Sequence, residues 1–269
     1  LNNMYEISLG LRFIKSGRDS GFINFISVLS TIGIALGVAT LIIVLSVMNG
    51  FQKEVRDKML AVLSHVEVLS RDFDESEINK ISTFLGKRKD VVGIAPFSNA
   101  QSIVAGEDRV EGILVKGIDP DNEKNVSDVL NQIVEGDDSL LKANSFGLII
   151  GFEFAKKMNV SVGDSIILMS AENASSIVGL VPRIKKFKIV AVFSSGHFQY
   201  DSNMVLAHKD DVKKFFRFSS INGLKIKLLN MHDAPKFSAE MQKIIPDYFY
   251  VRDWTHENKN WFAAVQIEK

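Results

Sequence analysis

The residues of this chain that could carry catalysis are few and scattered. The block Gly163-Asp164-Ser165-Ile166 resembles the surroundings of the serine nucleophile in one esterase class. It lies mid-chain in a predicted turn, and no Asp-x-x-His block follows near the C-terminus to supply a base and the group that orients it. We therefore interpret the block as an ordinary turn, and we expect no enzymatic activity in this chain.

Metal, nucleotide and nucleic-acid chemistry also lack their usual residues. The five histidines, at positions 65, 197, 208, 232 and 256, include no pair four residues apart, and there is no cysteine. Zinc sites are usually built from such groups, so we expect no metal and no other cofactor. The phosphate-binding motif G-x-x-x-x-G-K-[ST] is missing. With 32 basic and 32 acidic residues, the net charge of zero does not favour nucleic acid as a partner.

A long uncharged run near the N-terminus is the strongest signal in the sequence. No Asp, Glu, Lys or Arg occurs from Ser20 to Gln52, although 24% of the chain is charged. About 20 apolar residues in a helix are enough to cross the hydrocarbon of a bilayer. The run predicts a membrane protein with one transmembrane helix over 21–50. The alternative, a buried helix of a soluble protein, rarely runs this long without a charge.

The segments on either side of the span have helical periodicity. Apolar residues recur every fourth position in the first twenty residues, which predicts an amphipathic interfacial segment over 1–20. The same period continues over 51–64 and predicts a stalk helix. Within the span, Gly33 and Gly37 form a G-x-x-x-G pair, a spacing that lets a second helix approach closely.

Five apolar residues of the span are candidates for facing lipid or a substrate cavity. Ordinary helix packing or lipid contact is the favoured explanation for each taken singly. The five are Phe25, Leu29, Val44, Val47 and Met48.

Strand and helix patterns alternate after the stalk. A strand–helix–strand order begins near residue 65 and returns over 223–252, on either side of a middle section. This pattern predicts an α+β domain over 65–255 with two lobes. One lobe would comprise 65–118 and 206–255, and an inserted, mainly β lobe would comprise 119–205. A last helix, within 256–269, would lead back to the membrane.

A long apolar tip separates two predicted strands of the middle section. The tip covers Ser170 to Arg183, between strands at 165–169 and 185–194. Loops of this length are usually functional, and an exposed apolar one is typical of a docking element. Periodicity alone equally allows a tip folded back on its own sheet. The residues concerned are Ile177, Val178, Gly179, Leu180, Val181 and Pro182.

Several blocks closely resemble the LolC/LolE family of lipoprotein-releasing ABC-transporter permeases. These are YEISLGLRFIKS (5–16), SVMNGF (46–51), ILVKGIDP (113–120), GLIIGFEFAKKMNVSVGDSIILMS (147–170) and VPRIKKFKIVAVFSSG (181–196). The blocks keep the family order over nearly the whole chain. The family belongs to a wider MacB-like group that includes FtsX, and the resemblance implies a MacB-like domain with a porter-like lobe.

The resemblance implies a role in a bacterial inner membrane, with the large domain in the periplasm. Such permeases have four membrane helices, so we expect the chain to be truncated before its second one. Two permease subunits, identical or different, would join a LolD-type cytoplasmic ATPase. The complex would move acylated lipoproteins from the membrane to a LolA-type periplasmic carrier.

The resemblance also favours docking as the role of the apolar tip. In LolC-type subunits a protruding hairpin, the hook, captures the carrier. Ser170 to Arg183 falls where the hook would be, with 177–183 as its carrier-binding residues. Arg183 would help to hold the carrier, so Arg183→Ala should weaken docking without unfolding the domain. Lys185 and Lys186 would lie at the hook's base.

Two other functions stay open at this point. One is another MacB-like permease, either an exporter subunit or an FtsX-type regulator of cell-wall hydrolases. The other is a membrane-anchored enzyme, which would need a catalytic site that the sequence does not show.

Overall fold

The computed structural model of the chain forms two compact units, Leu1–Glu54 and Val55–Lys269. It describes residues 5–6, 9–10, 12, 21–62, 64–70, 75–106, 109–170, 175–176, 179–180, 182–218 and 221–257. Most of the predicted interfacial segment, and all of 258–269, lie outside these residues.

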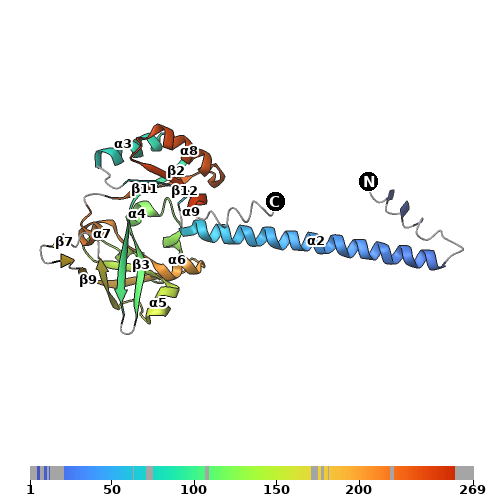
Figure 1. Cartoon of the computed structure of the whole chain (residues 1–269), viewed down its shortest axis with the longest axis horizontal. Coiled ribbons are helices and arrows are strands. Elements are labelled where there is room, and N and C mark those ends of the chain that lie inside the picture. The colour runs from blue at the N-terminus through green and yellow to red at the C-terminus, as the bar shows by residue number, and fades with distance from the viewer. Residues whose placement is uncertain are drawn as a thin grey trace. The chain divides into compact units, whose positions relative to one another are not determined.

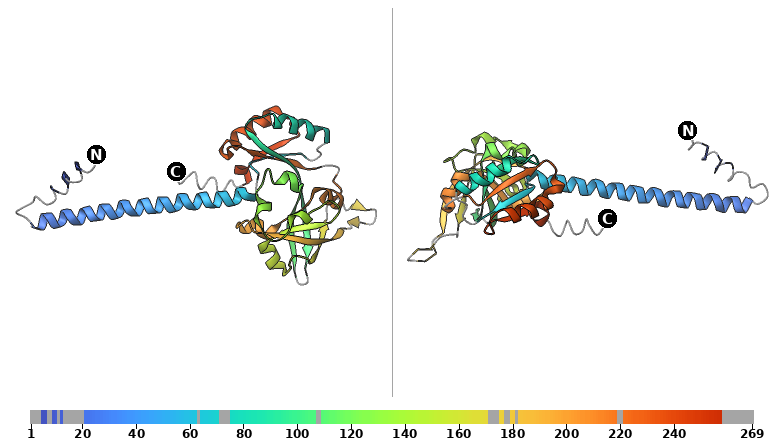
Figure 2. Two further views of the ribbon diagram at one scale, coloured as in Figure 1. Left: turned by 180° about the vertical axis from the view of Figure 1, so that it is seen from behind. Right: turned by 90° about the horizontal axis from the view of Figure 1, so that it is seen from above.

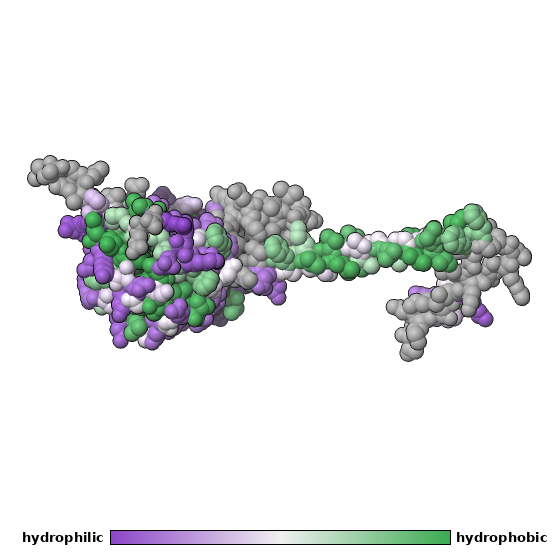
Figure 3. Space-filling view, turned by 90° about the horizontal axis from the view of Figure 1, so that it is seen from below, coloured by the Kyte–Doolittle hydropathy of each residue, from purple (hydrophilic) through white to green (hydrophobic). Residues whose placement is uncertain are grey.

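The uncharged run forms one uninterrupted helix, α2 (Gly21–Val62) (Figure 2). The predicted span and stalk are therefore parts of a single element. Its stretch Phe25–Phe51 has a mean hydropathy of 2.6 and is long and apolar enough to cross a membrane. The Thr31 and Thr40 hydroxyls donate to the carbonyls of Ser27 and Leu36, at 2.7 and 2.8 Å. These bonds pair hydroxyls that lipid could not satisfy. The surface of the stretch Phe25–Phe51 is almost all apolar (Figure 3).

The second unit is built on one mixed sheet, in the order β12-β1-β11-β2-β3-β10-β5-β9-β4, with β6 pairing β2 and β9. The strands are β1 (Val66–Leu69), β2 (Val91–Ala105), β3 (Val110–Ile118), β4 (Ile133–Gly136), β5 (Gly147–Gly151), β6 (Ser165–Ser170), β9 (Arg183–Phe193), β10 (Met204–His208), β11 (Gly223–Leu228) and β12 (Tyr250–Asp253). A separate pair is formed by β7 (Ser175–Ser176) and β8 (Gly179–Leu180) (Figure 1).

Short helices cover the sheet (Figure 1). They are α3 (Glu75–Gly86), α4 (Pro120–Glu123), α5 (Phe152–Met158), α6 (Phe198–Asn203), α7 (Lys209–Phe216), α8 (Ala234–Ile244) and α9 (Trp254–Glu257). Three 3-10 turns lie at Val129–Gln132, Asp138–Leu140 and Met231–Asp233. Helices α3 and α8 lie together over the part of the sheet made by β12, β1, β11 and the start of β2, where apolar side chains of both layers form one buried cluster.

Strand β2 joins two parts of this sheet. The sequence predicts two separate strands, at 91–94 and 101–105, but the structure has one strand of 15 residues. Its first half pairs with β11, and its second half pairs with β3 and β6. The 15-residue strand persists because each half has an antiparallel partner for its backbone groups.

The buried clusters divide the domain differently from the predicted lobes. Val104 of β2, Val115 of β3 and Val212 of α7 lie in the same core cluster as Phe154 and Phe187 of the predicted insertion. The cause is the sheet itself, since β3 pairs with β10 and β10 pairs with β5. The second half of β2, with β3 and α7, therefore packs with 119–205. The run α6–β10–α7 has no counterpart among the predicted elements.

Candidate docking hairpin

The predicted hook begins where a regular strand pair ends. Strands β6 and β9 pair antiparallel from Ser165↔Lys188 to Ser170↔Arg183. Beyond that last rung, β7 and β8 pair with each other, Ser175↔Leu180 and Ser176↔Gly179. In the part of the chain described, neither pairs with a strand of the large sheet. The two arrows form a small ribbon apart from the main sheet (Figures 1 and 2).

Only part of the predicted tip is described. Gly179 and Leu180 form β8, and Pro182 is exposed. Ile177, Val178 and Val181 lie outside the described residues.

Arg183 has a partner within the domain. It is half-buried, and its Nη1 donates to the carbonyl oxygen of Phe215 at 3.2 Å. Phe215 lies in the last turn of α7, where carbonyls have no partner in their own helix. A basic side chain there donates a hydrogen bond to one of these carbonyls and interacts favourably with the negative end of the helix dipole. Arg183 therefore ties the base of the hairpin to α7, a contact with no sequence signal.

The two predicted lysines of the hairpin base lie on opposite faces of β9. Successive side chains in a strand alternate between faces, so Lys185 shares its face with Arg183 and with buried Phe187. The Lys185 Nζ lies 4.1 Å from the centre of the Phe146 ring. Lys186 points the other way and is exposed. A single partner surface laid on one face of β9 can meet only one of the two lysines.

The face of the sheet that carries Lys186 is unusually apolar. Pairing aligns Ile103 of β2, Met169 of β6 and Ile184 of β9 in one row. Ile184 is 62% exposed, and Ile103 41%. The next row holds Ala105, Ile167 and Lys186. We name this surface the β2–β6–β9 face. The sequence signal was available, because each of these strands has an isoleucine on the face opposite a buried apolar residue of the same strand: Ile103, Ile167 and Ile184.

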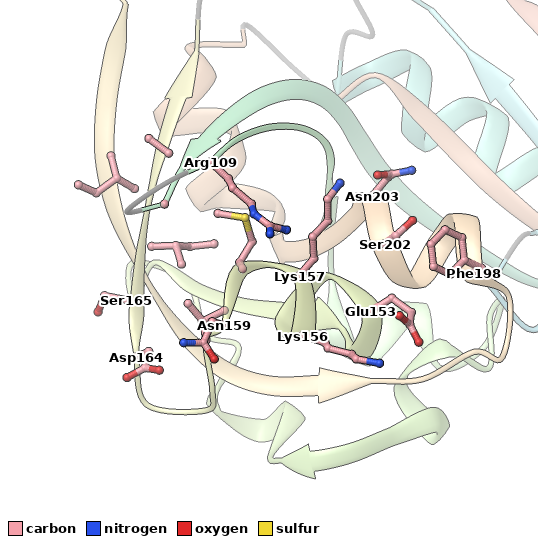
Figure 4. Close-up of a pocket in the computed structure, with 16 residues that line it drawn as sticks. Arg109, Glu153, Lys156, Lys157, Asn159, Asp164, Ser165, Phe198, Ser202 and Asn203 are labelled. Atoms are coloured by element: carbon pink, nitrogen blue, oxygen red, sulfur yellow. The ribbon is translucent and has the colours of Figure 1, made fainter.

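A broad cavity lies at the other end of β6 from the hairpin. Its volume is about 1120 Å³, and its walls come from the β2–β3 turn, β6, α5 and α6 (Figure 4). Both cations and carboxylates line it. Arg109 and Lys157 lie near each other on one side, and Glu153 lies beside Lys156. The Lys157 Nζ is 2.7 Å from Glu111 Oε2.

This cavity includes the esterase-like block, but not the arrangement an esterase needs. Gly163 takes a left-handed conformation with φ of 98°. The Asp164 carboxylate accepts a hydrogen bond from the Ser161 N–H at 2.8 Å, as in an ordinary turn. None of the described residues that line the cavity beside Ser165 is a histidine. Among the described residues, no group of three or more His, Asp or Glu side chains is placed to hold a metal ion.

The predicted packing positions of α2 are open in this structure. A Cβ added at Gly33 or Gly37 would meet no atom within 4 Å. The five candidate lipid- or cavity-facing residues are all exposed: Phe25, Leu29, Val44, Val47 and Met48. They remain predictions.

Comparison with known proteins gives a consistent set of relatives. The family model of the MacB-like periplasmic core domain matches residues 27–244. The lipoprotein-releasing system transmembrane protein LolC of Neisseria meningitidis is 33% identical over 98% of this chain and 64% of its own length. LolC of Xylella fastidiosa is 32% identical over 99% of this chain and 64% of that protein. LolE of Haemophilus influenzae is 26% identical over 95% of this chain and 62% of that protein.

The chain spans somewhat less than two thirds of the length of these curated relatives. Among solved structures, the periplasmic region of MacB from Actinobacillus actinomycetemcomitans matches 74% of this chain and 94% of its own, at 10% identity and a TM-score of 0.46. The family model covers most of this chain, from within the apolar helix α2 to the end of α8. The chain belongs to the family of MacB-like periplasmic core domain proteins, and within it is similar to the transmembrane proteins LolC and LolE of the lipoprotein-releasing system.

Proposed function

We propose that this chain is a permease subunit that releases lipoproteins from the bacterial inner membrane and passes them to a soluble periplasmic carrier. The observation that carries the proposal is the similarity to LolC along almost the whole chain. The β7–β8 ribbon supports it, because this ribbon lies where the resemblance expects a carrier-binding hook.

The division of labour follows from what the chain contains. Withdrawing an acyl chain from a bilayer costs about 0.8 kcal/mol per CH₂, so one long chain costs about 10 kcal/mol or more. The sequence has no phosphate-binding loop with which to use ATP. The energy would come from a LolD-type ATPase subunit, and a second permease subunit would complete the complex. The chain itself would bind and move its cargo without bond chemistry.

The carrier would meet two neighbouring surfaces. One is the β7–β8 ribbon with Leu180 and Pro182. The other is the β2–β6–β9 face, which begins at Ile184 directly below the ribbon and carries Lys186 at its side. An apolar row with a lysine beside it suits a partner whose apolar surface is edged by carboxylates.

A photo-crosslinking residue at Leu180, in the full-length protein in its native membrane, tests this function. We expect a crosslink to a small soluble periplasmic protein that carries acylated lipoproteins. The matched control is the same residue at Leu140, which is 51% exposed on a separate 3-10 turn and should give no such product.

Other products would assign other functions. A crosslink from position 180 to a cell-wall hydrolase would support an FtsX-type regulator. Products confined to the chain itself would contradict a docking hairpin and would leave an exporter subunit as the favoured function.

A further inference from the structure

The first and last described strands of the domain are neighbours. Three residues separate the end of α2 at Val62 from the start of β1 at Val66, and β12 runs directly into α9. The two pair antiparallel, Val66↔Asp253 and Glu67↔Arg252. The Trp254 N–H donates to the His65 carbonyl oxygen at 3.1 Å, one rung beyond the strands. The first and last described strands of the domain therefore meet at one place, which we name the β1–β12 junction.

The backbone hydrogen bonds of β12 would by themselves hold this strand only weakly. It has four residues and lies at the end of the sheet, where β1 is its only strand partner among the described residues. A force that pulls α9 away from β1 loads these rungs one at a time, beginning at His65–Trp254. A short edge strand loaded in this way opens rung by rung.

A buried ion pair lies at the second strand rung. The Glu67 carboxylate is 6% exposed and accepts hydrogen bonds from Arg252 Nη2 at 2.6 Å and Nε at 3.0 Å. On its other side, Glu67 lies opposite Lys225 of β11. Burial by itself raises the pKa of Glu67, but Lys116 and Arg252 outweigh it, so the pKa is lowered and the carboxylate stays charged.

Side chains from other elements hold both strands at the same place. The Leu228 N–H donates to His65 Nδ1 at 3.1 Å. The Ser238 hydroxyl of α8 donates to Asp253 Oδ2 at 2.8 Å, and Trp254 Nε1 donates to the Met231 carbonyl oxygen at 3.1 Å. The Glu67–Arg252 pair is the one contact of this set that joins the side chains of β1 and β12 directly.

We infer that the Glu67–Arg252 pair is a lock that stops β12 from peeling away from β1 at the β1–β12 junction. Both donors bond the same oxygen, Glu67 Oε2, and charge-assisted hydrogen bonds of this kind are stronger than the backbone rungs on either side. The lock makes the junction open only when the whole domain opens. This inference concerns the domain alone and stands apart from the proposed function.

Hydrogen exchange on the full chain in detergent tests the lock. Arg252→Met keeps most of the side-chain stem and removes the guanidinium. We expect the amides of Val251 to Trp254 to exchange at least about tenfold faster, equivalent to about 1.4 kcal/mol of local opening, while those of β5 and β9 keep their rates. The control is Lys209→Met in α7, which removes the ion pair of Lys209 with Asp119. The side chains of Lys209 and Arg252 are equally exposed, and the control should leave the exchange of the β12 amides unchanged.

A second variant distinguishes loss of the lock from the cost of leaving a buried charge without its partner. Arg252→Met leaves Glu67 buried without its main partner, whereas Glu67→Leu combined with Arg252→Met removes both charges. We expect β12 to exchange fast in both. Wild-type exchange of β12 in the double variant, or equal acceleration of β12, β5 and β9 in both variants, would overturn the inference.

Discussion

At the scale of single residues, the domain buries several charges on one face of its sheet. Lys225 of β11 and Glu123 of α4 are 1% and 0% exposed, and Lys225 Nζ lies 2.6 Å from Glu123 Oε1. The Lys225 ammonium also lies 5.5 Å from the centre of the Phe97 ring. A buried pair of this kind gives little net stability over apolar residues, but losing one partner leaves an uncompensated charge.

Lys225→Met should therefore destabilise the domain by about 3–5 kcal/mol. The measurement is urea unfolding of the full chain followed by circular dichroism. Glu123→Leu combined with Lys225→Met removes both charges and should recover most of the loss. A double variant as unstable as the single one would contradict this account.

His65 gives the domain a pH dependence with a definite sign. Burial, and then the nearby charge of Lys227, lower its pKa below the usual 6.5. The folded state therefore holds this proton less tightly than the unfolded state, and stability falls as pH drops below about 6.5 until the folded-state pKa is passed.

His65→Gln should flatten the stability curve between pH 7.5 and pH 5.5, because glutamine does not titrate. The measurement compares unfolding midpoints of wild type and variant across that range. His232→Gln serves as control, since His232 is exposed on a 3-10 turn. Parallel curves for wild type and His65→Gln would show that another group is responsible.

At the scale of elements, close backbone approach decides how α5 and α6 are seated. Gly151 ends β5 and begins α5, and a Cβ there would lie 2.2 Å from the Asp201 carbonyl oxygen of α6. Gly151→Ala should cost about 1–3 kcal/mol through overpacking. Gly112→Ala in β3 is the matched control, since a Cβ there meets nothing within 4 Å. Equal unfolding midpoints for the two variants would contradict the close approach.

The alternation of β9 separates its two lysines, and this bears on the proposed docking. Lys186→Glu places a repelling charge beside the β2–β6–β9 face and should lower the yield of the position-180 carrier crosslink several-fold. Lys185→Glu should lower it less, because Lys185 lies over Phe146 on the opposite face. A larger loss for Lys185→Glu would mean that the carrier approaches the other face of β9.

At the scale of the whole molecule, the chain combines a helix with an almost entirely apolar surface and a domain with its own cores. The helix has no apolar partner within its own unit, because its side chains from Phe25 to Phe51 are exposed where described. Such a helix is stable in a bilayer without protein partners, and its small residues mark where a second helix would pack.

Gly37→Leu should leave the unfolding midpoint of the domain unchanged, because space around Gly37 is open. It should instead disrupt packing of α2 against another membrane helix. The chain has no cysteine, so a single cysteine at Gly33 reports that packing through crosslinking in the native membrane. Ile34→Leu is the control. Unchanged crosslinking in Gly37→Leu would show that Gly37 is not part of the packing surface.

Several elements were determined by the sequence itself. The uncharged run predicts a long apolar helix, and α2 extends through this run. The strands near 65–69, 109–118 and 147–151 follow from local alternation or a short apolar run, and β1, β3 and β5 lie there. These features are local, because each depends on which side chains within one element avoid water.

The tertiary structure alone decided which distant residues meet. Lys225 and Glu123 are 102 positions apart, and nothing near either residue indicates that it is buried. Arg183 reads as a free basic group until α7 brings the Phe215 carbonyl oxygen to it, 32 positions away. The continuity of β2, and with it the actual division of the cores, depends on partners that pair with each half. Periodicity reports the burial of apolar side chains, whereas the pairing of polar groups and strands depends on how the chain returns to itself.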